Sequence, residues 1–233
     1  MKKLGIVGGM GPESTIEYYN KILYGYQKKH SKNYFPNIII ESVNVFEVLQ
    51  LCKIEDFDAL TELLLNAIKN VSSGGADFAV LAANTPHIVF ERLKKKSPIK
   101  LISIVEATYK KVEEDKVKTV GLLGTSFTMD SHFFKKPFID NGIKIVVPQE
   151  KIRDFINDKI TNELEYGIIK EETKQEFIQI IEEFKEREKL EGIILGCTEL
   201  PLLLKDVKLP LNVYDTMEIH INSILSDIIE SKW

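Results

Sequence analysis

Short apolar runs alternate with stretches of helical periodicity along most of this chain of 233 residues. In the helical stretches apolar side chains recur three and four positions apart, as they do over residues 60–71. The apolar runs are short and continuous, which is typical of strands in a parallel sheet covered by helices on both faces. The expected strands are residues 4–7, 38–40, 78–82, 101–104, 119–123, 144–147, 192–195 and 211–214. Further helices are expected over residues 106–114, 151–166, 171–187 and 217–229.

The expected strands fall into two series of similar order, which meet near residues 104–116. This pattern predicts an α/β protein of two pseudo-symmetric lobes, each a parallel sheet flanked by helices. We expect the first lobe to comprise residues 1–105 with 215–233, because the last helix can return to it, and the second to comprise residues 106–214. No linker-like segment separates the lobes, so we expect a tight pair with a cleft between them.

Charge and cysteine content narrow the class of protein. The formal net charge is −4, so no overall basic field favours nucleic acid, and the chain has only two cysteines, which suits a reducing cytoplasm. No apolar run approaches the ~18 residues that a membrane span needs. The apolar stretch after Met1 is broken by Gly8 and Gly9, unlike a signal peptide. We therefore expect a cytoplasmic protein that binds neither nucleic acid nor membranes.

Four loops that directly follow expected strands are rich in small residues and hydroxyls. They are residues 8–15, 83–87, 124–128 and 196–199. Because ligands of parallel α/β sheets bind outside the carboxyl ends of the strands, these loops are the expected binding region. Their backbone N–H groups and hydroxyls suit an anionic small molecule.

Several common kinds of site lack their motif in this sequence. The glycines of residues 8–11 have neither the dinucleotide-binding spacing nor the Gly-Lys-Ser/Thr ending of an ATP loop. No set of His, Cys and carboxylate residues has metal-ligand spacing, and no Gly-x-Ser-x-Gly elbow of an α/β hydrolase occurs. We therefore expect neither a dinucleotide or ATP site nor a metal site.

Cys197 is the candidate nucleophile or acid–base group. It follows Gly196 at the end of an expected strand and precedes Thr198 and Glu199. A helix that begins there would lower the thiol pKa and favour the thiolate, whereas a lone cysteine is otherwise more often a buried structural residue. Cys52 has no comparable loop and is expected to be structural.

Taken together, the loops resemble those of the aspartate/glutamate racemase family. The resemblance is carried by residues 4–15, 84–87, 122–125 and 196–199, so it extends over nearly the whole chain. It implies two α/β lobes related by pseudo-twofold symmetry, an active site between them, no cofactor, a small amino-acid or dicarboxylate substrate, and a homodimer.

The resemblance also implies a reaction. Members of this family commonly use one cysteine from each lobe, so that one thiolate removes the α-proton and the other thiol returns a proton to the opposite face. In this chain Cys197 is the remaining thiol, and Ala83 stands at the vacant position of the second base. The expected substrate-binding residues are Met10, Asn84, Thr85, His87, Thr125, Thr198 and Glu199. From the residues alone, His87 either lines the site or caps the helix that follows it.

A methyl group cannot exchange protons, so Ala83 leaves three hypotheses. The first is an aspartate or glutamate racemase with reduced or one-sided activity, in which water or His87 replaces the second thiol. The second is a single-cysteine enzyme, such as a decarboxylase, that protonates an enolate on one face. The third is a non-catalytic protein that binds an acidic metabolite. Lys53 and Lys170 are candidate partners for a side-chain carboxylate of the substrate.

Overall fold

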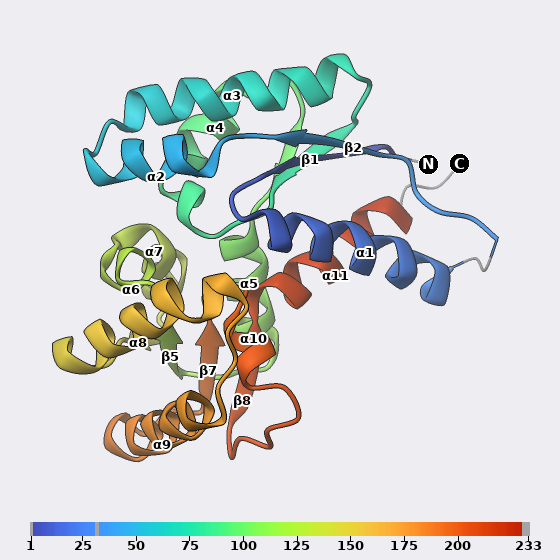
Figure 1. Ribbon diagram of the computed structural model, residues 1–233. Helices are drawn as coiled ribbons and strands as arrows, with labels where there is room; N and C mark the ends of the chain where they lie inside the picture. The colour runs from blue at the N-terminus through green and yellow to red at the C-terminus, as the bar shows by residue number, and fades with distance from the viewer. Residues whose placement is uncertain (1, 31–32, 230–233) are drawn as a thin grey trace. The chain divides into compact units, whose positions relative to one another are not determined.

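The computed structural model describes residues 2–30 and 33–229 (Figure 1). The chain divides into two compact units, Met1–Ala107 with His220–Trp233, and Thr108–Ile219. Each unit is built on a four-stranded parallel sheet with flanking helices, as the alternation of apolar runs and helical stretches predicts. None of the helices in the described ranges is long and apolar enough to cross a membrane.

The first unit contains a sheet with the strand order β2-β1-β3-β4. Its strands are β1 (Leu4–Gly8), β2 (Ile38–Ser42), β3 (Phe78–Leu81) and β4 (Lys100–Ile102). Its helices are α1 (Pro12–Lys29), α2 (Val45–Lys53), α3 (Phe57–Ser73), the 3₁₀ turn η1 (Thr85–Val89) and α4 (Phe90–Lys96). Figure 1 shows α3 on one side of β1 and β2 and α1 on the other, so apolar side chains of both helices are buried against the sheet.

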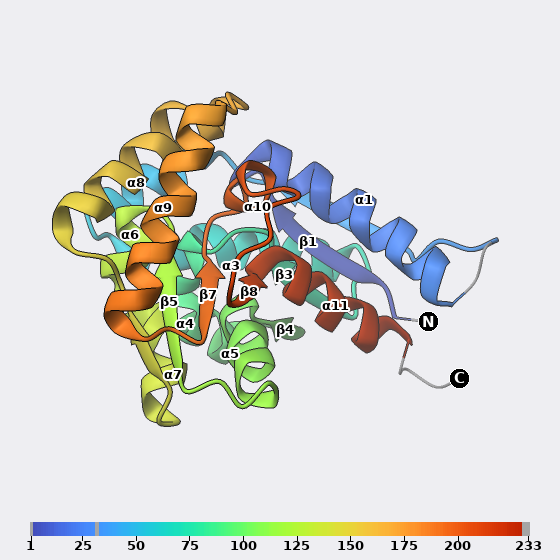
Figure 2. The same ribbon diagram turned by 90° about the horizontal axis from the view of Figure 1, so that it is seen from below.

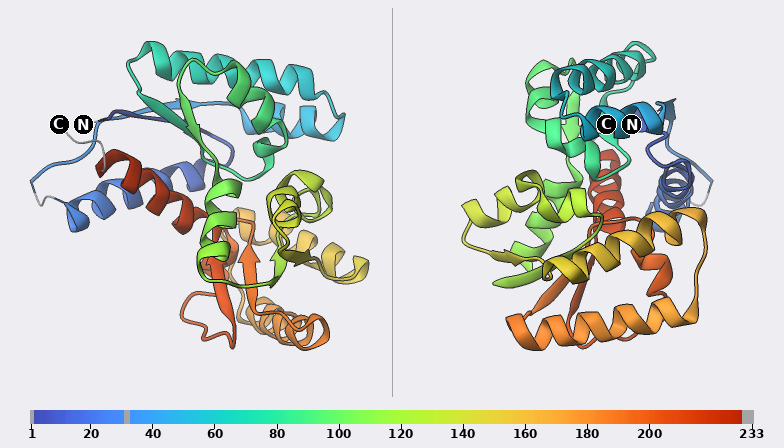
Figure 3. Two further views of the ribbon diagram at one scale, coloured as in Figure 1. Left: turned by 180° about the vertical axis from the view of Figure 1, so that it is seen from behind. Right: turned by 60° about the vertical axis from the view of Figure 1, so that its left-hand side comes forward.

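The second unit repeats this strand order as β6-β5-β7-β8. Its strands are β5 (Thr119–Leu123), β6 (Lys144–Val146), β7 (Gly192–Leu195) and β8 (Asn212–Asp215). Its helices are α6 (Ser126–Asp130), α7 (His132–Asp140), α8 (Glu150–Asn162), the 3₁₀ turn η2 (Leu164–Tyr166), α9 (Glu171–Glu188) and α10 (Leu200–Leu203). Figures 2 and 3 show α9 running alongside this sheet, and its residues Phe177 and Phe184 are buried.

Two helices carry the chain from one unit to the other. They are α5 (Ile104–Glu114) and α11 (Thr216–Ile229). The Oδ1 of Asp215 accepts a hydrogen bond from the N–H of Glu218 at 3.1 Å and thereby caps the last helix. Pro12 lies in the first turn of α1, where its missing N–H costs nothing.

Several predicted element boundaries differ from the structure by one or more residues, and two of these differences have a clear structural cause. The fourth strand ends at Ile102 and not at Ile104, because the hydroxyl of Ser103 accepts the N–H of Glu106 and starts α5. The helix predicted over residues 151–166 stops at Asn162 and is followed by a 3₁₀ turn. Gly167 then takes a left-handed conformation with φ 69°, which turns the chain toward α9.

Candidate active site

In the first unit, Ala83 follows the third strand at the edge of the sheet where strands β1 and β3 end. The N–H of Ala82 donates to the carbonyl of Val7 at 2.9 Å, which extends the pairing of β3 with β1 by one residue. Ala83 is therefore the first residue beyond the paired strand.

In the second unit, Cys197 occupies the corresponding position. The N–H of Gly196 donates to the carbonyl of Leu123 at 2.7 Å, which again extends the pairing of the third strand with the central one. Cys197 is the next residue along the chain. Because the two sheets share one strand order, Ala83 and Cys197 are topologically equivalent.

The side chain of Cys197 is half-buried and hydrogen-bonded within its own loop. Its S–H donates to Oε2 of Glu199 at 2.7 Å, and the hydroxyl of Thr198 donates to Oε1 of the same carboxylate at 2.9 Å. One carboxylate therefore binds both neighbouring donors, and the geometry holds the thiol in its protonated form.

Burial and nearby carboxylates raise the pKa of the Cys197 thiol well above its ordinary value. Burial has the largest effect, and the negative charges of Glu199 and Glu165 act in the same direction. The backbone N–H of Glu199 lowers this pKa, as expected of donors at the start of a helix, but its effect is outweighed. The helix α10 begins only at Leu200 and has four residues, so the carboxylates and the loss of hydration prevail.

The loop of Thr125 lies beside that of Cys197, because β5 and β7 are neighbours and end together. A Cβ added at Gly196 would lie 3.0 Å from the carbonyl oxygen of Leu123, so glycine allows the two loops to approach. The Oγ1 of Thr125 accepts the N–H of Thr128 at 3.4 Å and thereby caps α6. Thr125, Thr198 and Glu199 are thus brought to the same sheet edge as the thiol.

Glu165 is a residue of this region that the sequence did not indicate. Loss of hydration and the carboxylate of Glu199 both raise its pKa, and Glu165 in turn raises the pKa of Cys197. It lies on the turn η2, whose place beside the thiol depends on how α8 and α9 pack. No local motif marks such a position, because the turn is remote from Cys197 along the chain.

Hydrogen bonds to the buried carboxylate of Glu163 stabilise the turn η2, which carries Glu165. Glu163 accepts hydrogen bonds from Thr173 at 2.6 Å, Lys170 at 2.9 Å and Lys159 at 3.0 Å. These three donors lower the pKa of Glu163 to about 2. The cluster ties the end of α8 to the start of α9, and it binds Lys170, the residue that the sequence suggested for a substrate carboxylate.

In the first unit, the loop after β1 is shaped by glycine. Gly9 has φ +85°, where a side chain would be strained, and an added Cβ would lie 2.3 Å from a backbone carbonyl oxygen. The hydroxyl of Thr15 accepts the N–H of Gly9 at 2.8 Å and donates to the carbonyl of Gly11 at 3.1 Å. Met10 lies in this loop. In the loop after the neighbouring strand β3, Asn84 follows Ala83 and Thr85 begins the turn η1.

His87 neither caps the helix α4 nor offers a nitrogen to a ligand. Its Nδ1 bonds to the carbonyl of Ala83 at 2.9 Å, and its Nε2 accepts the N–H of Ile104 at 3.3 Å. The ring stacks on Phe90 with centroids 4.9 Å apart. Burial, with a contribution from His220, lowers the pKa of His87 to about 3. The predictions that His87 caps α4 or replaces the second thiol are therefore wrong: it caps α5 and holds Ala83.

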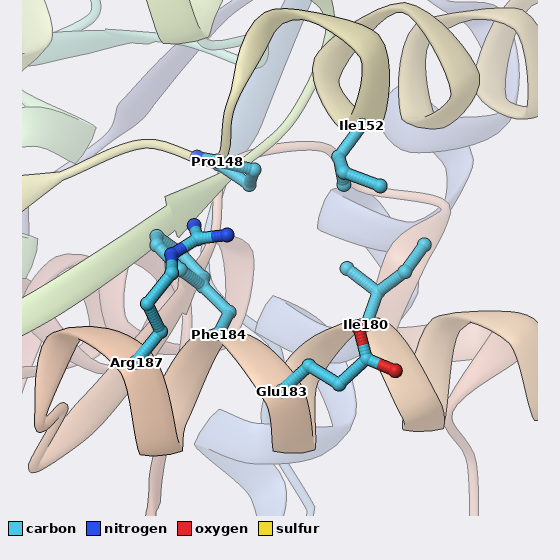
Figure 4. A pocket seen from close by; sticks show the side chains of 6 residues that line it. All are labelled: Pro148, Ile152, Ile180, Glu183, Phe184 and Arg187. Carbon is cyan, nitrogen blue, oxygen red and sulfur yellow. The ribbon is translucent and has the colours of Figure 1, made fainter.

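A small hollow in the second unit is lined by other residues than these (Figure 4). It has a volume of about 20 Å³, room for about one water molecule, and Arg187 covers the ring of Phe184 at 5.5 Å. Its lining residues are Pro148, Ile152, Ile180, Glu183, Phe184 and Arg187. The hollow is too small for an amino acid and contains none of the predicted site residues.

Comparison with known proteins identifies the family. The family model of Asp/Glu/hydantoin racemases matches residues 7–224. A candidate Asp/Glu racemase from Yersinia pestis is 32% identical with a TM-score of 0.92, covering 99% of this chain and 100% of its own. An aspartate racemase homologue from Pyrococcus horikoshii OT3 is 36% identical with a TM-score of 0.88, again over 99% and 100% of the two chains.

A curated relative agrees with these structures. The broad specificity amino-acid racemase RacX of Bacillus subtilis is 24% identical over 91% of this chain and 92% of its own length. The matched regions of the family model and of the two solved structures together include both four-stranded sheets and the loops that follow their strands. The chain belongs to the Asp/Glu/hydantoin racemase family.

Proposed function

We propose that this protein is a cofactor-independent amino-acid racemase, an isomerase in which Cys197 exchanges a proton with the α-carbon of the substrate. The observation that carries the proposal is the half-buried thiol of Cys197, hydrogen-bonded to Glu199 at the end of β7 in a member of a racemase family. The Cys197 loop thus carries an S–H group that can donate a proton and, at Thr198, a hydroxyl group.

The chemistry requires a weak acid to be deprotonated. Removing the α-proton of an amino acid leaves an enolate-like dianion, which preorganised hydrogen-bond donors must stabilise. We propose that Thr125 acts as such a donor from the second unit, joined by Thr198 when its hydroxyl turns from Glu199 to the substrate. From the first unit we propose Asn84, Thr85 and the backbone of Met10. In the donating step the S–H bond of Cys197 breaks, the electron pair of the carbanion forms the new C–H bond, and sulfur is left as a thiolate.

We propose that Ala83 marks the vacant position of the second base. Its equivalence to Cys197 in the strand order supports this assignment. Because His87 is engaged through both ring nitrogens, water is the remaining candidate for the second proton, and water is a weak base without a tuned neighbour. Inversion is therefore expected to be slow or one-sided. The location of the active site between the lobes stays a prediction of the sequence analysis.

Aspartate and glutamate are the first candidate substrates. The names of the Yersinia and Pyrococcus proteins support this choice. A dicarboxylate substrate needs a cation for its side chain, and Lys170 is bound to Glu163, which leaves Lys53 as the candidate from the sequence.

A second substrate class is favoured by the charges near the thiol. Glu199 contacts Cys197, and Glu165 acts electrostatically on both. Two carboxylates repel an additional negative charge and attract a positive one. Amino acids with neutral or basic side chains are therefore the alternative, and the relative RacX is described as having broad specificity.

A one-face enzyme is the second candidate function. The protonated thiol of Cys197 together with the methyl group of Ala83 suits protonation of an enolate on one side, as in a decarboxylase. We also propose a homodimer, as the family resemblance implies, and a location in the cytoplasm, which the low cysteine content suits.

Chiral chromatography tests the proposal on single enantiomers of aspartate, glutamate, alanine and lysine. The opposite enantiomer should form with the unmodified protein and not with Cys197→Ala, while Cys52→Ala should behave as the unmodified protein. Release of carbon dioxide from an α-disubstituted malonate, with no inversion of the four amino acids, would favour the one-face enzyme. Ligand-dependent thermal stabilisation without any turnover would favour a binding protein.

A further inference from the structure

Both oxygens of the Glu199 carboxylate are bound by donors from the residues directly before it. Oε2 receives the S–H of Cys197 at 2.7 Å and Oε1 receives the hydroxyl of Thr198 at 2.9 Å. A carboxylate bound at both oxygens has one orientation, so its position relative to the sulfur is fixed by the loop itself.

We infer that Glu199 is a positioning residue for Cys197: it accepts the hydrogen bond of the thiol, which holds the side chain in one rotamer and keeps the proton on sulfur until the carbanion of the substrate takes it. The inference rests on the proposed function, in which Cys197 exchanges a proton with the α-carbon. It assigns Cys197 the role of an acid in the resting protein.

The charges around the thiol support this assignment. A thiolate at this position would lie next to the carboxylate of Glu199 and would also feel that of Glu165 on the turn η2. Like charges at such distances disfavour ionisation. After the thiol donates its proton, the same repulsion favours rapid return of a proton to sulfur, which restores the acid.

The pH dependence of cysteine alkylation tests the inference directly. Iodoacetamide reacts with the thiolate, so its rate between about pH 6 and about pH 11 reports the ionisation of the thiol. Peptide mass spectrometry reads Cys197 separately from Cys52. In Glu199→Gln the midpoint should fall by roughly 1 pH unit or more, with roughly tenfold faster alkylation at about pH 8. The matched control Glu182→Gln changes an exposed glutamate of α9 and should leave the midpoint unchanged.

A second variant covers the case in which Glu199→Gln does not fold. Glu199→Asp keeps the charge but shortens the side chain by one methylene, which withdraws the carboxylate from sulfur, so the midpoint should move in the same direction by a smaller amount. An unchanged or higher midpoint in a folded Glu199→Gln protein would overturn the inference. Alkylation needs no substrate, so it tests separately whether Glu199 keeps the proton on sulfur. A protein that shows the shift but never inverts an amino acid would overturn the proposed function and the substrate step of the inference, and would confirm only that Glu199 holds the thiol.

Discussion

Ala83 and Cys197 each stand two residues beyond the end of the third strand of a four-stranded parallel sheet with the same strand order. In both sheets the intervening residue donates its N–H to the central strand. The two positions therefore have the same backbone setting, and they differ in whether the side chain can carry a proton.

This equivalence predicts the effect of restoring a thiol. Since a positioned acid–base group contributes about 10²- to 10⁴-fold to a rate, Ala83→Cys should raise the rate of inversion by at least about tenfold. Chiral chromatography of the product measures it. Ala82→Cys, which moves the thiol back by one residue, is the control and should bring no gain. An inversion rate of Ala83→Cys equal to that of the unmodified protein would show that the position no longer serves as a second base.

Glu165 is predicted to set the charge preference for the substrate. Replacing it by glutamine removes one of two negative charges near Cys197, so kcat/KM for aspartate should rise relative to that for lysine. Steady-state kinetics on both substrates give this ratio. The same change at Glu172, an exposed residue of the first turn of α9, should leave the ratio as it is. A ratio that moves toward lysine in Glu165→Gln would contradict the assignment.

Two buried histidines make the first unit sensitive to acid. Burial lowers the pKa of His87 from 6.5 to about 3, and that of His220 from 6.5 to about 4, so both are neutral when folded and take up protons on unfolding. His220 is held by the hydroxyl of Tyr18 at 2.8 Å and the carbonyl of Ile102 at 3.1 Å. Their contribution to stability is complete above pH 6.5 and is lost as the pH falls from there toward 4 and then 3.

Urea unfolding at a series of pH values measures this loss. Each histidine should remove up to about 1.4 kcal/mol of unfolding free energy per pH unit within that window. His220→Gln should flatten the dependence, whereas His132→Gln, at an exposed position, should leave it unchanged. A slope that stays the same in His220→Gln would mean that other groups cause the acid sensitivity.

Gly196 is predicted to be required for the packing beneath Cys197. A methyl group there would lie 3.0 Å from both Leu122 Cδ1 and the carbonyl oxygen of Leu123, and the backbone cannot move aside freely. Gly196→Ala should therefore lower the free energy of unfolding by about 1–3 kcal/mol. Gly11→Ala is the control, because its nearest neighbour would be 4.0 Å away. Equal stabilities for the two variants would show that the loop relaxes without cost.

Much of the fold could be predicted from periodicity. The strands of both sheets are short apolar runs, and β7 matches residues 192–195 without a shift. The end of β4 was missed because Ser103 can continue a strand or cap a helix, and the bond to Glu106 that decides between them is visible only in the folded chain.

The site could be predicted only in part. The loops of Thr125 and Cys197 follow from the ends of neighbouring strands, which the strand pattern predicts. The role of His87 could not be predicted, because its partners Ala83 and Ile104 meet it through the fold and not through spacing. Glu165 was missed for the same reason, and the rise in the Cys197 pKa depends on burial that no motif encodes.

Exchange of the α-proton for deuterium is the most direct test of Cys197 as the proton-exchanging group. Each enantiomer of aspartate, glutamate, alanine and lysine is incubated in deuterated water, and loss of the α-proton signal is followed by NMR. We expect deuterium at the α-carbon of at least one enantiomer with the unmodified protein and with Cys52→Ala, and no exchange above background with Cys197→Ala. Exchange at an undiminished rate in Cys197→Ala would contradict this role of Cys197.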